Sequence, residues 1–267
     1  MTSTLPPTST TPDIAGKVAI VTGASRRIGI GAAVCRALAA AGANVLFTHW
    51  GAYDAAMDYG DPDGPDALLD ELRGLGVRAE AIAADLSRPE VPDSVLATAG
   101  DRLGTPSILV NNAAHSTRDG YEALDAATLD AHYAVNLRGM ALLSVAFARG
   151  YAGGDGGRII NLTSGQDLGP MPGELAYAAT KGAISAFTRS LAAGVAATGI
   201  TVNAVNPGPT DTGWMTHDLK AALLPKFGLG RLGAPEDAAR LIAFLASDAA
   251  GWITGQVINS EGGFLRE

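Results

Sequence analysis

The sequence predicts a single α/β domain in which about seven parallel strands form a doubly wound sheet with helices on both faces. Short runs of β-branched residues alternate with Ala- and Leu-rich segments of helical period along most of the chain. The expected strands are continuous apolar runs, which is typical of strands buried on both faces of a parallel sheet. Right-handed crossovers between such strands produce the doubly wound arrangement.

The expected elements follow one another in a regular order. In the first half, the pattern predicts strands at residues 17–23, 43–49 and 77–86 and helices at residues 32–41 and 65–75. In the second half, it predicts strands at residues 108–110, 157–164, 200–208 and 256–259 and helices at residues 123–150, 176–197 and 235–247. Residues 51–66 and 210–233 are punctuated by Gly, Pro and Asp, so we expect loops there, the second with a short helical piece.

The composition is typical of a folded protein with a small-molecule partner. The 267 residues are 47% apolar and 17% charged, with a net charge of −8. This acidic balance argues against a nucleic-acid or anionic-membrane surface, since both attract clustered Lys and Arg. No apolar run is long enough for a membrane helix, and the lone Cys35 cannot form an internal disulfide, so we expect a soluble, cytoplasmic protein. Residues 1–13 are rich in Thr, Ser and Pro and predict a disordered tail before a folded domain of residues 14–267.

A glycine-rich segment follows the first expected strand and opens the first expected helix. Residues 22–31 are Thr-Gly-Ala-Ser-Arg-Arg-Ile-Gly-Ile-Gly. A helix N-terminus offers unpaired N–H groups to a pyrophosphate, and glycines let the phosphate approach the backbone. The usual Gly-x-Gly-x-x-Gly order is absent. A dinucleotide site and a plain βα turn therefore both stay open for this segment taken alone.

A tyrosine and a lysine are spaced for the same helix face. Tyr177 and Lys181 stand at i and i+4, which places phenol and ammonium about one turn apart. A Lys cation beside a Tyr favours the phenolate and lowers the tyrosine pKa toward neutral pH, as a general acid/base requires. The alternative is an ordinary surface pair, because this spacing is common by chance.

These motifs together resemble the short-chain dehydrogenase/reductase family. The resemblance rests on the glycine segment, Asn111-Asn112-Ala113-Ala114, Asn136, Ser164, Tyr177-x-x-x-Lys181 and Pro207-Gly208, which occur in the family's order and spacing over roughly residues 15–264. The chain is most similar to 3-oxoacyl-carrier-protein-reductase-like ketoreductases. The resemblance implies a Rossmann fold and assigns residues 14–267 to one dinucleotide-binding catalytic domain. It also implies a homotetramer that pairs its long helices.

The resemblance implies hydride transfer between a nicotinamide and a small-molecule carbonyl or secondary alcohol, without a metal. Tyr177 would be the acid/base, and Lys181 would hold the nicotinamide ribose and keep the tyrosine acidic. Ser164 would hydrogen-bond the developing alkoxide. Asn136 would hold a water that links Lys181 to solvent. For Asn136, Asn111 and Asn112, a structural amide that closes strand ends is the alternative.

The resemblance also implies a set of cofactor contacts. Asp85 and Leu86 match the segment that meets the adenine. Asn112 and Ala113 match the residues on the ribose side. Pro207 and Gly208 match the segment that holds the carboxamide. The full expected set is Gly23, Ser25, Arg26, Arg27, Gly29, Ile30, Gly31, His49, Asp85, Leu86, Asn112, Ala113, Ala114, Tyr177, Lys181, Pro207, Gly208, Thr210 and Thr212.

Two departures from the family pattern concern this cofactor site. The glycine loop is two residues longer than the usual Thr-Gly-x-x-x-Gly-x-Gly, so Gly29 and Gly31 match the last two glycines and residues 26–28 bulge. Longer loops resemble those of enoyl reductases, but these usually separate Tyr and Lys by six residues, whereas three lie between them here. The keto/alcohol interpretation is therefore preferred. The second departure is Ala114, which replaces a glycine.

The end of the second strand predicts NADP(H), with NAD(H) as the alternative. Family members that prefer NAD place an acidic residue there, but here the strand ends at His49 and the nearest carboxylate is Asp54. Arg26 and Arg27 border the same pocket and could hold a ribose 2′-phosphate. If both point into solvent, Thr48 and His49 would bind an unphosphorylated ribose instead.

Four residues are substrate-contact candidates: His115, Gln166, Trp214 and Met215. His115 follows the Asn-Asn-Ala-Ala segment, and the apolar Trp214 and Met215 could exclude water from the site. A catalytically silent NAD(P)-binding regulator and an enoyl reductase are the alternative functions. A regulator should lack part of the Ser, Tyr and Lys set, which is complete here. A sugar epimerase would usually need a larger C-terminal domain.

Overall fold

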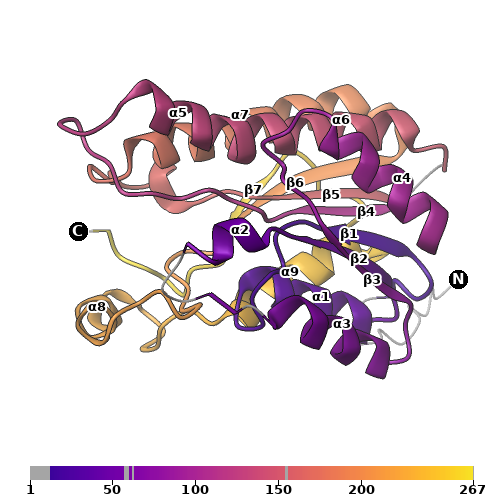
Figure 1. Ribbon diagram of the computed structural model, residues 1–267, viewed down its shortest axis with the longest axis horizontal. Helices are drawn as coiled ribbons and strands as arrows, with labels where there is room; N and C mark the ends of the chain where they lie inside the picture. Colours follow the sequence, from indigo (N-terminus) through magenta and orange to yellow (C-terminus); the bar gives the residue numbers. More distant parts are fainter. Residues whose placement is uncertain (1–12, 57–59, 62, 154–155, 267) are drawn as a thin grey trace, which may run out of the picture.

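Seven parallel strands form one sheet in the order β3-β2-β1-β4-β5-β6-β7 (Figure 1). The structure, a computed structural model, describes residues 13–56, 60–61, 63–153 and 156–266, so residues 1–12 of the expected tail lie outside the described residues. The strands are β1 (Val18–Val21), β2 (Asn44–His49), β3 (Ala79–Ala83), β4 (Ile108–Asn111), β5 (Gly157–Leu162), β6 (Ile200–Asn206) and β7 (Val257–Asn259). The predicted fold class is confirmed.

Helices cover both faces of the sheet (Figure 1). One layer holds α1 (Ile30–Ala40), α3 (Gly64–Gly74) and α9 (Pro235–Ala246), and the other holds α4 (Val91–Leu103), α6 (Met140–Gly150) and α7 (Leu175–Val195). The shorter helices are α2 (Gly51–Asp54), α5 (Ala126–His132) and α8 (His217–Leu223), with a π-helix at Tyr133–Gly139 and 3₁₀ turns at Gly165–Asp167, Ala196–Thr198, Leu224–Lys226 and Asp248–Ala250.

Each face of the sheet has its own hydrophobic core. Successive strand residues point to opposite faces, so Leu46 packs in the α4/α6/α7 layer and its neighbour Phe47 in the α1/α3/α9 layer. Both side chains are fully buried, and burial of such a side chain stabilises the fold by about 1.5–3 kcal/mol. Cys35 of α1 is also fully buried, and this burial raises the pKa of its thiol.

Three segments differ from the sequence expectation. Residues 51–66 were expected to be a loop, but α2 lies within them and α3 begins at Gly64. Helix α4 was not predicted, although Pro92 near its start and Gly104 after its end, at φ +105°, are typical boundary residues. The helix expected at residues 123–150 begins at Ala126 and changes to a π-helix before α6.

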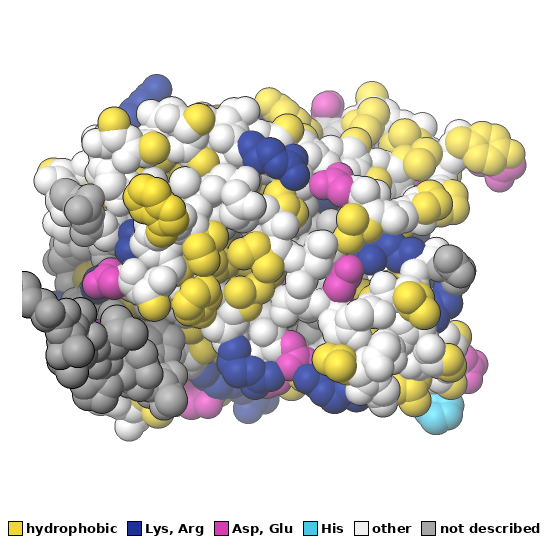
Figure 2. Space-filling model, turned by 180° about the vertical axis from the view of Figure 1, so that it is seen from behind, with side chains coloured by type: hydrophobic (Ala, Val, Ile, Leu, Met, Phe, Trp, Pro, Cys, Tyr) yellow, Lys and Arg dark blue, Asp and Glu magenta, His cyan; other side chains and the backbone are white. Residues whose placement is uncertain are grey.

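The sheet topology determines where a ligand can bind. The chain leaves β1 toward one face of the sheet and β4 toward the other, so a crevice opens at the carboxyl ends of these adjacent strands. On the face seen from behind, basic and acidic side chains are interspersed with apolar groups (Figure 2). No helix in the described part of the chain combines the length and the apolar character needed to cross a membrane.

Candidate active site

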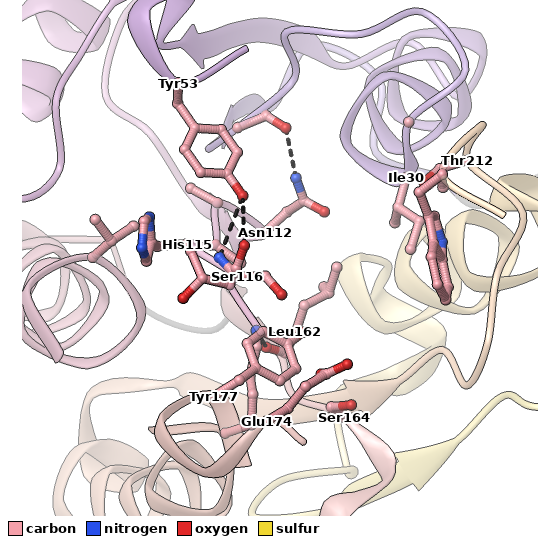
Figure 3. Close-up of a pocket in the computed structure, with 18 of the residues that line it drawn as sticks. Ile30, Tyr53, Asn112, His115, Ser116, Leu162, Ser164, Glu174, Tyr177 and Thr212 are labelled. Atoms are coloured by element: carbon pink, nitrogen blue, oxygen red, sulfur yellow. Dashed lines mark hydrogen bonds between the residues drawn. The ribbon is translucent and has the colours of Figure 1, made fainter. Parts of the chain in front are cut away.

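A cavity of about 1820 Å³ occupies this crevice. Its walls come from the glycine loop, the ends of β2 and β4, the segment after β5, the start of α7 and residues 207–212. In the close-up, Tyr53 lies on one side, Tyr177 and Ser164 lie on the opposite side, and Ile30 and Thr212 lie at one end (Figure 3). The cavity therefore brings together the glycine loop and the Tyr/Lys helix, which are distant in sequence.

The glycine loop presents an uncapped helix N-terminus to the cavity. Gly29 is the N-cap residue of α1 and has no side-chain cap, and the first turn contains no acidic residue. Gly23 lies at φ +72°, and a Cβ there would be 2.6 Å from the Cα of Ala113, two residues after the end of β4. Unpaired N–H groups with a positive dipole end are suited to a phosphate group. Ile30 and Gly31 line the cavity beside them.

The lengthened part of this loop forms a tight turn that contains Arg26 and Arg27, and the two arginines have different partners. Gly29 N donates to the Arg26 carbonyl at 2.9 Å, which closes the turn. Arg26 lines the cavity and donates to the Thr212 carbonyl at 2.8 Å. The guanidinium of Arg27 instead pairs with Asp61 at 3.0 Å, and Arg27 is not among the described residues that line the cavity.

The end of β2 lies beside this turn. Thr48 Oγ1 accepts a hydrogen bond from Gly23 N at 3.2 Å, and Trp50 N donates to Ser25 Oγ at 3.3 Å. His49 lines the cavity half-buried, and burial lowers its pKa. Asp54 of α2, the nearest carboxylate after the strand, also lines the cavity.

The amide side chains at the end of β4 hold strands together. Asn111 Nδ2 donates to Ser144 Oγ at 2.9 Å and to Asn161 Oδ1 at 2.8 Å. Asn112 Nδ2 donates to the carbonyls of Thr22 and Gly23 at 2.9 and 2.8 Å. Both amides therefore act structurally, as the alternative interpretation proposed. Asn112 also lines the cavity, as do the expected residues Ala113, Ala114, Asp85 and Leu86.

Asn136 is buried in the π-helix and joins two walls of the site. Its Oδ1 accepts from His115 N at 2.7 Å, and its Nδ2 donates to the His115 carbonyl at 2.9 Å and to Thr180 Oγ1 at 3.1 Å. These bonds fix the backbone after β4 against α7. Asn136 itself is not among the described residues that line the cavity.

Ser164, Tyr177 and Lys181 meet at the cavity wall. Ser164 follows β5 and lowers the pKa of Tyr177, but burial has the larger effect and raises it. Lys181 Nζ donates to the Leu162 carbonyl at 2.7 Å and lies 5.5 Å from the centre of the Tyr177 ring. Burial lowers the pKa of Lys181 to about 8. The net shift of the Tyr177 pKa in this structure is therefore upward, opposite to the expected lowering, because burial has the largest effect.

A carboxylate fixes the start of the helix that carries this pair. Asp119 accepts hydrogen bonds from Leu175 N at 2.5 Å and from Ala176 N at 2.9 Å, which satisfies two otherwise unpaired donors at the start of α7. Glu174 lies beside them, half-buried, and burial raises its pKa. Its charge also raises the pKa of Tyr177. Sequence reasoning did not identify either carboxylate.

The substrate candidates divide into two groups. His115 and Trp214 line the cavity, as expected. Met215 is buried, and Gln166 Nε2 contacts Met171 Sδ at 2.9 Å; neither residue is among the described residues that line the cavity.

Sequence reasoning also missed Tyr53 of α2. Its ring lies 5.6 Å from that of His115, and its hydroxyl accepts from Ser116 N at 3.3 Å (Figure 3). Tyr53 lies in a segment expected to be a loop, so only the aromatic residue itself could have indicated a contact across the crevice.

Comparison with known proteins agrees with this geometry. Residues 23–265 match the family described as enoyl-(acyl carrier protein) reductase. The chain is 56% identical over 252 residues to the uncharacterized oxidoreductase YjdA of Bacillus subtilis, covering 94% of this chain and 97% of that protein. It is 39% identical to the 3-oxoacyl-[acyl-carrier-protein] reductase FabG of Pseudomonas aeruginosa, covering 93% and 97%. The chain belongs to the short-chain dehydrogenase/reductase family.

A solved member of the short-chain dehydrogenase/reductase family has a closely similar structure. The short chain dehydrogenase from Burkholderia cenocepacia, in complex with NADP, superposes with a TM-score of 0.84 at 34% identity, covering 94% of this chain and 98% of that one. As a member of this family the chain is an oxidoreductase. Within the described ranges, no group of three or more His, Cys, Asp or Glu residues could hold a metal ion.

Proposed function

We propose that the protein is an NADP(H)-preferring reductase that interconverts a carbonyl compound and a secondary alcohol. The observation that carries this proposal is that Tyr177, Ser164 and Lys181 line one cavity that is continuous with the glycine loop. A phenol hydroxyl and a serine hydroxyl on the same wall can both donate to a carbonyl oxygen that gains negative charge.

The chain's own residues have distinct parts in this reaction. Bound NADPH supplies a hydride to the carbonyl carbon. Tyr177 donates a proton to the carbonyl oxygen. Ser164 donates a hydrogen bond to the same oxygen. Lys181, at the inner wall, binds the ribose hydroxyls, and Asn136 holds the His115 backbone in place.

The residues at the other end of the cavity fit a phosphorylated dinucleotide. The uncapped N-terminus of α1 suits the pyrophosphate, and Arg26 suits the ribose 2′-phosphate. The NADP complex of the Burkholderia relative supports this choice. We assign the adenine side to Asp85 and Leu86. The carboxamide side includes Pro207, Gly208, Thr210 and Thr212, all of which line the cavity.

Enoyl reduction is a second candidate, since the matching family is described by that activity. The separation of Tyr177 and Lys181 by three residues favours the keto/alcohol reaction instead. A silent regulatory protein is less well supported, because Ser164, Tyr177 and Lys181 come together at one wall.

The deciding experiment is an activity panel on the purified protein. Ketones, aldehydes, β-ketoesters and a crotonyl thioester are each tested with NADPH and with NADH. We expect reduction of at least one ketone or β-ketoester, with a higher kcat/KM for NADPH than for NADH. Reduction of the thioester alone would favour the enoyl alternative. Cofactor binding without any turnover would favour a regulatory protein.

The homotetramer remains a prediction for this chain. Pairing of α7 with its counterpart in another subunit would be consistent with its several alanines. Light scattering at micromolar concentration tests it, and a monomeric mass would refute it.

A further inference from the structure

The C-terminal strap, residues 261–266, lies across one end of the cavity. Leu265 N donates to the Lys226 carbonyl at 2.8 Å, and the rings of Phe264 and Phe227 lie 5.0 Å apart. These contacts hold the strap against the segment that follows α8. The strap and α8 lie on the same side of the molecule (Figure 1). Phe264 and Arg266 both line the cavity. The strap is therefore part of the site, although no sequence motif indicated it.

Arg266 is held in place by a nearly buried partner. Its Nη1 donates to Glu261 Oε1 at 2.9 Å, and its Nη2 donates to the second carboxylate oxygen. The two side chains are only 18% and 10% exposed. Glu261 Oε2 also accepts from Asn206 Nδ2 at 2.8 Å, and Asn206 Oδ1 accepts from Gly208 N at 2.9 Å. The paired guanidinium is thus held in one position at the cavity wall. Hydrogen bonds through Glu261 and Asn206 connect it to Gly208, in the segment proposed to hold the nicotinamide.

Two glycines make room for this arginine. A Cβ at Gly169 would lie 2.6 Å from Arg266 Cδ, and a Cβ at Gly165 would collide with the guanidinium. Both glycines also line the cavity, and Gly165 directly follows Ser164. The arginine therefore lies in a groove that exists only because the chain after Ser164 has no side chains at these two positions.

We propose that Arg266 is a specificity-determining and positioning residue. It supports the segment that carries Ser164, and it limits the size of the carbonyl substituent that can lie beside that serine. This inference rests on the proposed carbonyl reduction. The ion pair with Glu261 satisfies the guanidinium, so the limit that Arg266 sets is on size rather than on charge.

The first test measures the packing of Arg266 without any substrate. Gly169→Ala should lower the thermal unfolding midpoint by about 4 °C or more in the parent, because the new methyl group overpacks against the arginine. In an Arg266→Ala background the same change should have little effect, since the space is then free. Gly74→Ala, where a Cβ has nothing within 4 Å, is the matched control. Equal effects of Gly169→Ala in both backgrounds would overturn the packing argument.

The second test measures substrate selectivity with NADPH. The small ketone that the parent reduces best is compared with its benzyl-substituted analogue. Arg266→Ala should raise the ratio of kcat/KM for the bulky ketone to that for the small one by about tenfold. The KM for NADPH should stay within about threefold. Arg240→Ala, an exposed arginine paired with Asp237, should leave the ratio unchanged.

A further variant keeps this test decisive. Arg266→Ala alone leaves the Glu261 carboxylate nearly buried without its cation, which can destabilise the protein. Glu261→Gln combined with Arg266→Ala removes that charge and should show the same gain in selectivity. If the parent reduces ketones but Arg266→Ala and the double variant both keep the parent's ratio of kcat/KM for the bulky and the small ketone, this inference alone is refuted. A parent that reduces no ketone would refute the proposed function, and this inference with it.

Discussion

At the glycine-loop end of the cavity, which we call the backbone end, glycines let the chain segments after adjacent strands approach closely. At the Ser164 end, which we call the side-chain end, side chains from distant segments meet. Gly23 and Ala113 are in close contact where β1 and β4 lie side by side. By contrast, Ser164, Trp214 and Arg266 come from three separate parts of the second half of the chain.

This difference separates two ways in which a substitution can damage the site. At the backbone end, an added methyl group has no space, so the harm comes from what is introduced. At the side-chain end, apart from the two glycines packed on Arg266, the harm comes from the chemical group that is removed. The two ends should also affect different measurements, cofactor binding in the first case and turnover in the second.

The largest expected effect is at the side-chain end. Tyr177→Phe removes the proposed proton donor and should lower kcat by at least about 100-fold. The dissociation constant of NADPH, measured by fluorescence titration, should change by less than about threefold because the glycine loop is untouched. Tyr121→Phe, at a tyrosine that is 86% exposed, is the control. A Tyr177→Phe protein that keeps turnover within about threefold of the parent would exclude Tyr177 as the acid.

A glycine substitution tests the backbone end. A Cβ at Gly31 would lie 2.6 Å from the Gly23 carbonyl oxygen and 2.7 Å from Asn112 Nδ2. Gly31→Ala should therefore distort the loop and weaken NADPH binding by about thirtyfold, the effect of an overpacking cost near 2 kcal/mol. Gly100→Ala in α4, where a Cβ meets nothing within 4 Å, should bind NADPH normally. Unchanged affinity in Gly31→Ala would show that this end is more adaptable than the contacts indicate.

The smallest effect concerns the one side chain that we assign to the cofactor phosphate. Arg26→Ala should lower the ratio of kcat/KM for NADPH to that for NADH by about fivefold, because a charge-assisted hydrogen bond is lost. Arg27→Ala should leave that ratio unchanged, since Arg27 pairs with Asp61. Equal losses in the two variants would indicate a general effect of positive charge rather than a contact by Arg26.

The sequence predicted most of the backbone end and less of the side-chain end, for a physical reason. The glycine loop and the Tyr177/Lys181 pair are contiguous motifs, so their local pattern determines their geometry. Whether Arg26 or Arg27 faces the cavity depended on Asp61, which lies far along the chain. The pKa of Tyr177 likewise depended on burial rather than on its neighbour in the helix.

The side-chain end also contains contacts that no local pattern encodes. Tyr53 contacts Ser116 across the crevice. Arg266 packs against Gly165, although β6 and β7 lie between these two residues in the sequence. Glycines after a serine indicate a turn in a sequence, but they do not show which distant side chain fills the space above them.

The single cysteine of the chain provides an internal reporter of motion in the α1/α3/α9 layer. Cys35 has no exposed surface, and its raised pKa keeps the thiol protonated and unreactive at neutral pH. A thiol reagent can therefore label it only in molecules in which α1 has separated from the sheet or from α9. The labelling rate would measure how often this layer opens, without any engineered probe, and its decrease on addition of NADPH would measure how strongly the cofactor holds the layer closed.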